Sequence, residues 1–296
     1  MRRVAVVLAL AACQTGATTS ADPAFHGKLL HLQKAYKQCA TELGNVADAA
    51  RPDARPGILY DAACCAAQAG SADAAFAMLD RAIAAGWHRV AWLRDDDELA
   101  SLHADARWQR LLDTATAAED RAGQALGAPA LRKQLIAMMV RDQQVRDAIG
   151  DGGDGSDAEA AMTRMLAIDT ADTAQLARII AANGWPGRAL VGDDGASAAW
   201  LIAQHTPDHA LMRLCLVLMT AAVAAGDASA KELAYLYDRV AMMDDRPQLY
   251  GTQFKGTSLY PVEDEANVDA RRAAIGLPTM AEYRAGMAAL YGPDFQ

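Results

Sequence analysis

The chain has 296 residues, of which 52% are hydrophobic and 6% aromatic, and its formal net charge is −9. This length suits one large domain or two ordinary ones. The negative charge argues against nucleic acid as a partner, because its phosphates would repel the protein. Abundant alanine with few aromatic residues favours close-packed helices over sheets. The composition therefore predicts a mainly α protein with a buried core.

Residues 1–12 have the features of an export signal, with two arginines before an apolar run too short to span a bilayer. The run ends in Leu-Ala-Ala before Cys13, which resembles the lipobox of bacterial lipoproteins. In that family the cysteine thiol receives a diacylglycerol, and the chain is cut before it. The resemblance implies a lipidated Cys13 and a polar tether over 13–27, and we favour it over an ordinary cleaved signal. Gln14 stands where an Asp would indicate inner-membrane retention, so the expected anchor is the outer membrane, facing the periplasm.

Four further cysteines, Cys39, Cys64, Cys65 and Cys215, show neither a CxxC motif nor a Cys/His spacing that suits zinc. We interpret them as small buried apolar side chains. Cys64 and Cys65 are adjacent, so on a helix they point about 100° apart and cannot both face one partner. The alternative is a disulfide between Cys39 and Cys65, which an exported protein could form.

The first domain is expected over 28–121. Apolar periodicity predicts a helix over 28–43, and a loop with two prolines and two glycines follows it. Helices are then expected from about 56 to 70 and from about 72 to 85, where glycines can end them.

This helix pair resembles one tetratricopeptide unit, in which small residues let two helices approach closely and a larger one fills the gap. The family's packing positions are matched by Ala63, Gly70, Ala75, Leu79 and Ala82. The pattern D-x-x-L-x-x-L-x-x-D-x-R-W-x-x-L-L that follows resembles the helix that often closes such repeats. The resemblance implies a short groove for a peptide or a partner helix.

The second domain is expected over 130–292, after a change in composition near 122–130. After Pro247, alternating residues predict a short β-hairpin with its turn at Lys255-Gly256. Capping boxes are expected at Ser229 with Glu232 and at Thr279 with Glu282. Helices are expected over 131–149, 158–168, 172–183, 195–205, 208–225, 230–243, 266–275 and 280–290.

The second half is similar to a family of bacterial domains of unknown function. The resemblance covers roughly 130–290 in order and implies a compact, mainly helical fold, but it implies no activity. It is carried by the motifs RDQQVR (141–146), NGWPGRALVGDDGASAAWLIAQH (183–205), AYLYDRV (234–240), RPQLYGTQF (246–254), YPVED (260–264) and VDARRAAIGLP (268–278).

A set of polar residues in this half has two interpretations. The preferred one is a clamp of ion pairs and hydrogen bonds that holds an irregular loop on the helices, since buried charges need partners. The other is a pocket in which arginines grip a carboxylate or phosphate while His205 or Glu263 acts as acid or base. The candidate binding residues are Arg141, Asp142, Asp238, Arg239, Tyr250, Thr252, Gln253, Asp264, Arg271 and Arg272.

These residues lead to one geometric hypothesis. Alanine-rich helices offer few places to satisfy polar groups, and an unpaired buried one costs ~1–3 kcal/mol. We therefore expect the segment Tyr250–Gln253 to pack beside His205 and the Arg141-Asp142 pair.

No metal site and no cofactor are predicted. The acids at 95–98 suit a helix N-terminus better than a calcium loop, and those at 151, 154 and 157 have the wrong spacing for calcium. His205 has no HExxH companion, and there is no phosphate-binding or dinucleotide motif. The expected function is a lipid-anchored protein- or peptide-binding or scaffolding module of the cell envelope. The alternative is an envelope hydrolase that uses the polar residues around His205, Tyr250–Gln253 and Glu263.

Overall fold

The computed structural model of the chain describes residues 24–52, 54–150 and 156–292. Within these ranges the fold is mainly helical and has one two-stranded antiparallel sheet, as the sequence predicts. The expected export signal, Cys13, most of the tether and the acids at 151 and 154 lie outside the described residues. None of the described helices combines the length and the apolar character needed to cross a bilayer.

The N-terminal region forms a layered bundle of short helices. The helix expected over 28–43 is two helices, because Lys34 between them has a left-handed backbone with φ +59°. A lysine at such a backbone position is not visible to a periodicity argument. The elements are α1 (Phe25–Leu32), α2 (Tyr36–Ala49), α3 (Arg55–Gln68), α4 (Ala72–Ala84), α5 (Val90–Asp95), η1 (Asp97–Leu102) and α6 (Trp108–Gln124).

Helix α3 is the centre of this bundle and packs against α2 and α4. Pro56 lies in its first turn, where a missing N–H is not needed, and Gly70 follows its end with φ +72°. Ala62, Ala63 and Ala66 are no more than 1% exposed. Their small side chains let the neighbouring backbones approach closely.

A disulfide joins Cys39 on α2 to Cys65 on α3. The interpretation of all four cysteines as plain buried thiols is therefore wrong for this pair. It holds for Cys64 and Cys215, which are free and buried. Because Cys64 and Cys65 point to different sides of α3, only one of them can reach α2.

The C-terminal region starts after a short connection. Helix α8 is a single helix of 28 residues, whereas two helices were expected. The polar stretch around 169–171 contains no glycine or proline that could end it, and the Thr170 hydroxyl donates to the Leu166 carbonyl of the same helix. The helices are α7 (Pro129–Gly150), α8 (Ser156–Asn183), α9 (Arg188–His205), α10 (His209–Ala224), α11 (Ala230–Met243), η2 (Glu265–Asn267), α12 (Val268–Ala274) and α13 (Met280–Tyr291).

The two expected capping boxes differ. At α13, Thr279 and Glu282 form both reciprocal bonds of the box. At α11 only half of it forms, because Ser229 accepts from the Glu232 N–H while the Glu232 carboxyl accepts from Ser197 on α9. A tertiary contact therefore takes the place of the local bond.

The β-hairpin is shorter than expected. Strand β1 (Phe254–Lys255) pairs with β2 (Ser258–Leu259), so the turn lies at Gly256-Thr257, one residue later than predicted. Residues 250–253 are not in a strand. Gly251 has φ +70°, and a Cβ there would lie 2.7 Å from Met280 Sδ, so glycine is required for both reasons.

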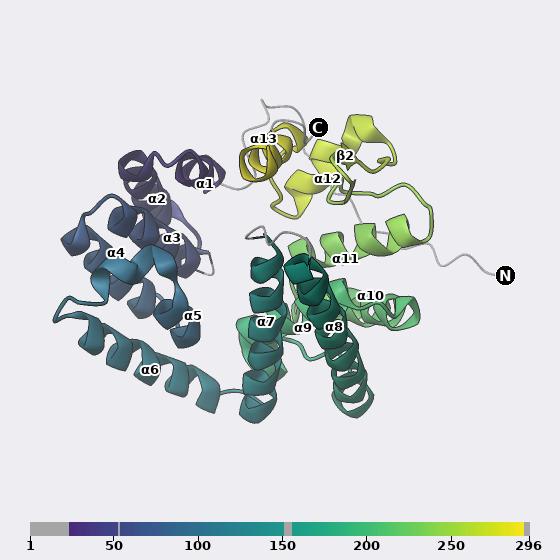
Figure 1. Cartoon of the computed structure of the whole chain (residues 1–296), viewed down its shortest axis with the longest axis horizontal. Helices are drawn as coiled ribbons and strands as arrows, with labels where there is room; N and C mark the ends of the chain where they lie inside the picture. Colours follow the sequence, from purple (N-terminus) through teal and green to yellow (C-terminus); the bar gives the residue numbers. More distant parts are fainter. Residues whose placement is uncertain (1–23, 53, 151–155, 293–296) are drawn as a thin grey trace.

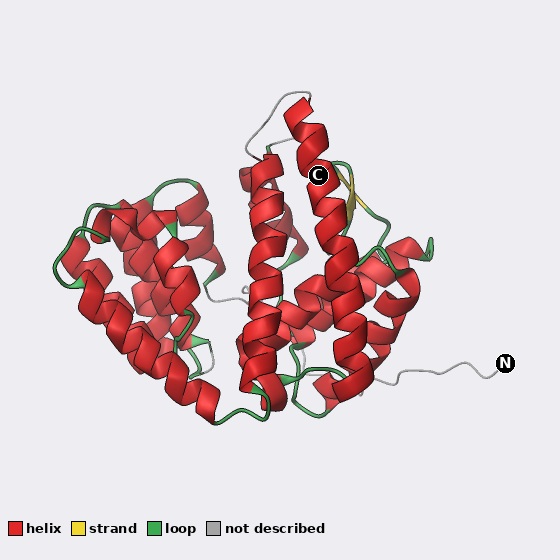
Figure 2. Ribbon diagram, turned by 60° about the horizontal axis from the view of Figure 1, so that its bottom comes forward, coloured by secondary structure: helices red, strands yellow, loops and turns green. Residues whose placement is uncertain are grey.

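The helices group into two bodies. Figure 1 shows α1–α6 on one side and α7–α11 on the other, with α12 and α13 above the second body and α13 beside α1. Figure 2 shows the long helices α7 and α8 side by side. One apolar core uses residues between 24 and 115, and a second uses residues between 135 and 240.

Candidate functional site

The carboxylate of Asp238 holds the loop that follows α11. Asp238 is fully buried and accepts the backbone N–H groups of Leu249, Tyr250 and Thr252 at 2.7–3.2 Å. It also accepts the Thr252 hydroxyl at 3.0 Å. Burial raises the pKa of Asp238, and the backbone bonds act against that rise. We call this arrangement the Asp238 clamp.

Two further buried side chains, those of Gln248 and Arg272, extend the clamp. Gln248 donates to the carbonyls of Gln253 and Tyr260 and accepts the Gln253 N–H. Arg272 donates to the carbonyls of Pro278 and Tyr250, at 2.5 and 2.6 Å. Backbone groups outside regular structure need such partners when they are buried. The polar groups are therefore occupied in fixing the loop.

The remaining candidates near this loop lie at its surface. Arg271 donates to the carbonyls of Leu249, Glu263 and Asp264. Asp264 has a left-handed backbone with φ +47°, and its carboxylate contacts Arg271 and Asn267. The exposed Glu263 side chain forms no hydrogen bond or ion pair with any described residue.

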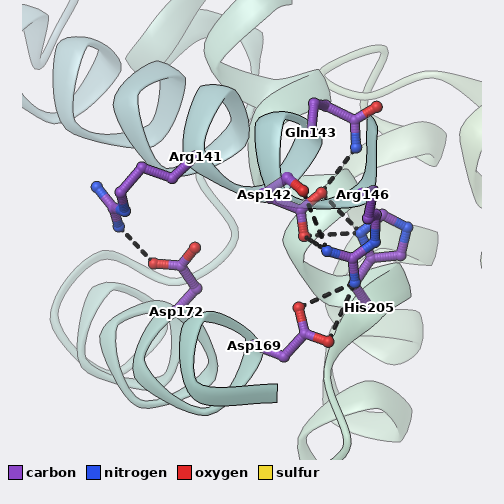
Figure 3. Close-up of polar contacts among 7 residues, drawn as sticks. All are labelled: Arg141, Asp142, Gln143, Arg146, Asp169, Asp172 and His205. Atoms are coloured by element: carbon purple, nitrogen blue, oxygen red, sulfur yellow. Dashed lines mark hydrogen bonds and ion pairs between the residues drawn. The ribbon is translucent and has the colours of Figure 1, made fainter. Parts of the chain in front are cut away.

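A second cluster surrounds Asp142 on α7, which is 1% exposed (Figure 3). Both of its carboxylate oxygens lie 2.9 Å from Nδ1 of His205 at the end of α9. Arg146 and Gln143 each donate to it at 2.7 Å. One buried carboxylate therefore receives three donors, from α7 and α9.

Two buried acids of α8 complete this cluster, which we call the Asp142 network. Arg146 also donates to Asp169 at 2.9 and 3.1 Å, and Arg141 donates to Asp172 at 2.6 Å (Figure 3). Burial raises the pKa of Asp172, and Arg141 opposes that rise. The network ties α7, α8 and α9 together by charge.

His205 is the member of the network with a free reactive atom. Its side chain is 21% exposed. With Nδ1–H donating to Asp142, the Nε2 lone pair is free, and it has no partner among the described residues. A carboxylate that orients one ring nitrogen in this way prepares the other to accept a proton. The His205–Asp142 pair can therefore act as a general base.

Arg239 follows Asp238 on α11. Its Nε is buried without a hydrogen-bond partner among the described residues. Burial and the charge of Arg146 both lower its pKa. The structure thus brings Asp142, Arg141 and His205 into one patch, with Arg239 close enough to feel its charge. Within the described ranges, no hydrogen bond or ion pair joins that patch to Tyr250, Thr252 or Gln253.

A cleft of about 290 Å³ lies between the two bodies. Trp92 of α5 lines it and is 46% exposed, and the guanidinium of Arg89 lies 5.1 Å from its ring centre. Met139 and Gln143 of α7 line the opposite side. Clefts between domains are a common location for ligand sites. We call this feature the interdomain cleft.

A buried ion pair fixes the wall of the cleft. Arg132 of α7 binds Asp194 of α9 through two bonds, and both side chains are less than 5% exposed. Arg132 also reaches Glu119 of α6 at 3.1 Å, and His88 lies 3.9 Å from Asp194. Burial acts to raise the pKa of Asp194, but Arg132 outweighs it, so this pKa lies below its usual value.

Sequence reasoning missed these cleft residues, although one signal was present. Arg132 lies between Leu131 and Leu135 on the apolar stripe of an amphipathic helix, where a charge requires a buried partner. Asp194 is 62 residues away, and nothing in its local sequence distinguishes it from the neighbouring acid Asp193. The partner could not be named without the fold.

The fold and these clusters define a two-body, mainly helical protein whose second body is organised around buried charges. The chain belongs to the family of unknown function DUF6624, whose family model matches residues 129–295, more than half of the chain. This confirms the prediction of an uncharacterised domain in the C-terminal half. Neither a curated protein nor a solved structure matches the chain.

Proposed function

We propose that this protein is a binding module of the cell envelope and that it holds a short peptide segment in the interdomain cleft. The observation that carries the proposal is the half-exposed Trp92, stacked with Arg89 at the edge of the cleft. Large exposed aromatic rings in concave sites are frequent anchors for peptide side chains. The cleft volume suits one or two residues of a peptide rather than a folded partner.

The lining of the cleft supports an apolar side chain as the anchor. Ile136, Met139 and Val140 of α7 face Trp92 across it. Methionine adapts its shape to different partners. The amide side chains of Gln143 and Gln144 border the same wall and can bond to a peptide backbone.

The charges around the cleft favour a peptide with a basic residue next to its apolar one. The lining includes the carboxylates of Asp95, Asp96, Glu119 and Asp194 and the guanidinium of Arg89. Glu119 and Asp194 are paired with Arg132, whereas the exposed Asp95 is free to meet a ligand cation. The proposed ligand is therefore a segment with an apolar residue beside a lysine or arginine.

Tryptophan fluorescence of the full chain, titrated with short peptides, tests this proposal. Peptides with an apolar residue beside lysine should bind, and the same peptides with glutamate in place of lysine should bind at least about tenfold more weakly, since like charges repel at close range. Trp92→Ala should abolish binding. Val217→Ala changes an exposed apolar residue on α10 and is the matched control, which should bind like the wild type. Binding by both variants is measured by calorimetry, because Trp92→Ala removes a fluorophore. Equal binding of both peptide series would contradict the proposal.

A hydrolase is the second candidate, and the His205–Asp142 pair is the observation that favours it. The base would activate water while Arg239 or Arg146 holds an anionic group of the substrate. Activity of the full chain on panels of ester and phosphoester substrates tests it. His205→Asn should lower turnover by at least about 100-fold, the typical contribution of a general base. The exposed His209, four residues later, supplies the control His209→Asn, which should leave turnover unchanged.

The location of the protein is part of the proposal. The lipobox-like residues before Cys13 support export and lipid anchoring, and the α3–α4 pair supports a tetratricopeptide-like role in binding. Cys13→Ser should release the protein from membranes or leave it uncleaved. A wild-type protein that fractionates as soluble and incorporates no labelled palmitate would contradict the anchor.

A further inference from the structure

A group of metal-ligating side chains meets in the N-terminal body, away from the Asp142 network. It combines residues from three elements: His31 of α1, Cys64 of α3, Glu98 of η1, and Asp96 just before η1. The chain brings them together across 67 positions, from 31 to 98. Such a set contains the sulfur, nitrogen and oxygen ligands that zinc accepts.

The distances among Cys64, Asp96 and Glu98 suit one ion. Ligand atoms of Cys64, Asp96 and Glu98 all lie within 4.8 Å of one another. The Cys64 Sγ lies 3.6 Å from Asp96 Oδ2. A tetrahedral zinc ion, with Zn–S of about 2.3 Å and Zn–O of about 2.0 Å, places sulfur and oxygen ligands about 3.5 Å apart.

His31 contacts this group through Glu98. Its Nε2 lies 2.7 Å from Glu98 Oε1 as an ion pair. Such an outer partner orients a carboxylate that could bind a metal.

The surroundings hold the ligands in position. The Tyr60 hydroxyl donates to Asp96 Oδ2 at 2.6 Å, and the N–H of Glu98 donates to Asp96 Oδ1 at 2.9 Å. Metal sites commonly have such outer bonds, which orient the ligating carboxylates. Cys64 is 3% exposed. Burial, followed by the charge of Asp96, raises the pKa of its thiol, so an approaching cation would have to displace the thiol proton.

We propose that Cys64, Asp96 and Glu98 bind one zinc ion, with His31 as the outer partner that orients Glu98. On binding, the thiol of Cys64 loses its proton to solvent and its sulfur bonds to the metal, while the two carboxylates bind through their lone pairs. The donor set excludes calcium and magnesium as preferred ions, since these take oxygen ligands. The site shares Asp96 with the lining of the interdomain cleft, but its metal binding is measured without any peptide.

Cobalt is the spectroscopic probe for this site, because a cobalt–thiolate bond absorbs in the near ultraviolet. Titration of the oxidised full chain with Co²⁺ should give that absorption at one equivalent, and Zn²⁺ should abolish it. Binding at pH 7 should release about one proton into a weakly buffered indicator solution, because the thiolate must form.

The two free cysteines provide a matched pair of variants. Cys64→Ala should lose the thiolate absorption and weaken Zn²⁺ binding more than about 100-fold, beyond the loss typical of outer-shell changes. Cys215→Ala, which removes a buried thiol in the other body, should bind like the wild type. Tyr60→Phe should weaken binding about 10–100-fold, because Asp96 loses its orienting bond.

Other outcomes would overturn the proposal. They are the absence of thiolate absorption in the wild type, its persistence in Cys64→Ala, or its loss in Cys215→Ala. Should Cys64→Ala fail to fold, Glu98→Gln replaces it, since it keeps the thiol and the size of the side chain while removing one charged ligand. Unchanged Zn²⁺ affinity in Glu98→Gln would also contradict the three-ligand site.

Discussion

The two bodies of this protein are held together by different means. Among the described residues, every buried polar or charged side chain lies at position 132 or later. The N-terminal core is made of alanine, leucine and aromatic side chains, with one disulfide between α2 and α3. The C-terminal body instead places ion pairs and a carboxylate clamp among its apolar residues.

The difference shows two ways to fix helices in one arrangement. Small apolar residues allow close approach, but they specify partners weakly, so a covalent link adds to the stability of the N-terminal body. Buried charges have a large desolvation cost, and they are tolerated only with well-placed partners. Charge pairs such as Arg132 with Asp194 therefore fix the register of the helices in the C-terminal body.

The largest effect is expected from breaking the buried pair between α7 and α9. Arg132→Ala leaves Asp194 buried and uncompensated, which should lower the free energy of unfolding of the C-terminal body by about 3–5 kcal/mol. Urea unfolding followed by circular dichroism measures this. Arg213→Ala, which removes an exposed partner of Asp244, is the control and should cost less than about 1 kcal/mol.

A double variant sharpens this prediction. Replacing both partners by apolar residues, as in Arg132→Met with Asp194→Leu, removes the unpaired charge and should restore much of the lost stability. If the single and double variants were equally unstable, packing rather than charge would fix this interface.

Reduction of the Cys39–Cys65 disulfide should have the next largest effect, in the N-terminal body. The bond closes a loop with a sequence separation of 26 residues, for which chain entropy gives about 3–4 kcal/mol. The double variant Cys39→Ser, Cys65→Ser should therefore lower the melting temperature of the N-terminal body and leave that of the C-terminal body unchanged. A variant that melts like the wild type would show that close packing alone is sufficient.

Changing the clamp should have a smaller effect. Asp238→Asn keeps the shape of the side chain but turns an NH₂ group towards N–H groups that need an acceptor. The loss should be about 2 kcal/mol, the usual cost of leaving a buried polar group unsatisfied. Thermal unfolding at neutral pH measures it. Asp245→Asn, on the exposed turn after α11, is the control and should have little effect.

Two buried acids of the C-terminal body should change its stability in opposite directions as the pH rises. The pKa of Asp194 is lowered, so its stabilisation is present above the ordinary value of about 3.9 and is lost as the pH falls through the folded pKa. The pKa of Asp172 is raised, mainly by burial, so stability falls as the pH rises from about 3.9 through the folded pKa. Melting temperatures of Asp194→Asn and Asp172→Asn, each compared with the wild type at pH 3 and pH 7, test this. The deficit of Asp194→Asn should grow at pH 7, while that of Asp172→Asn should shrink.

The smallest effect is expected from Cys64→Ala in the presence of a chelator. Cys64 lies among the alanines of α3, and the change removes one small buried group, so it should cost about 1 kcal/mol or less. A loss of several kcal/mol without metal would show that the thiol contributes more than packing to the N-terminal body. Chemical denaturation with EDTA present measures it.

The mainly helical fold, most helix ends and the family of the second half could be predicted from the amino-acid sequence. These features depend on residues close along the chain. Gly70 ends α3, Thr279 with Glu282 caps α13, and the apolar stripe of α7 shows which face is buried. The His205–Asp142 contact lies within the patch that we expected, although the bonds of Tyr250 and Thr252 go to Asp238 instead.

The contacts between distant groups became known only from the folded structure. Periodicity shows that a side chain faces inwards, but it does not show what lies opposite, because that depends on how the helices cross. Arg132 meets Asp194 over 62 positions, and Cys39 rather than Cys64 or Cys215 meets Cys65. The convergence of Cys64 with Asp96 and Glu98 is of the same kind, since no local spacing encodes it.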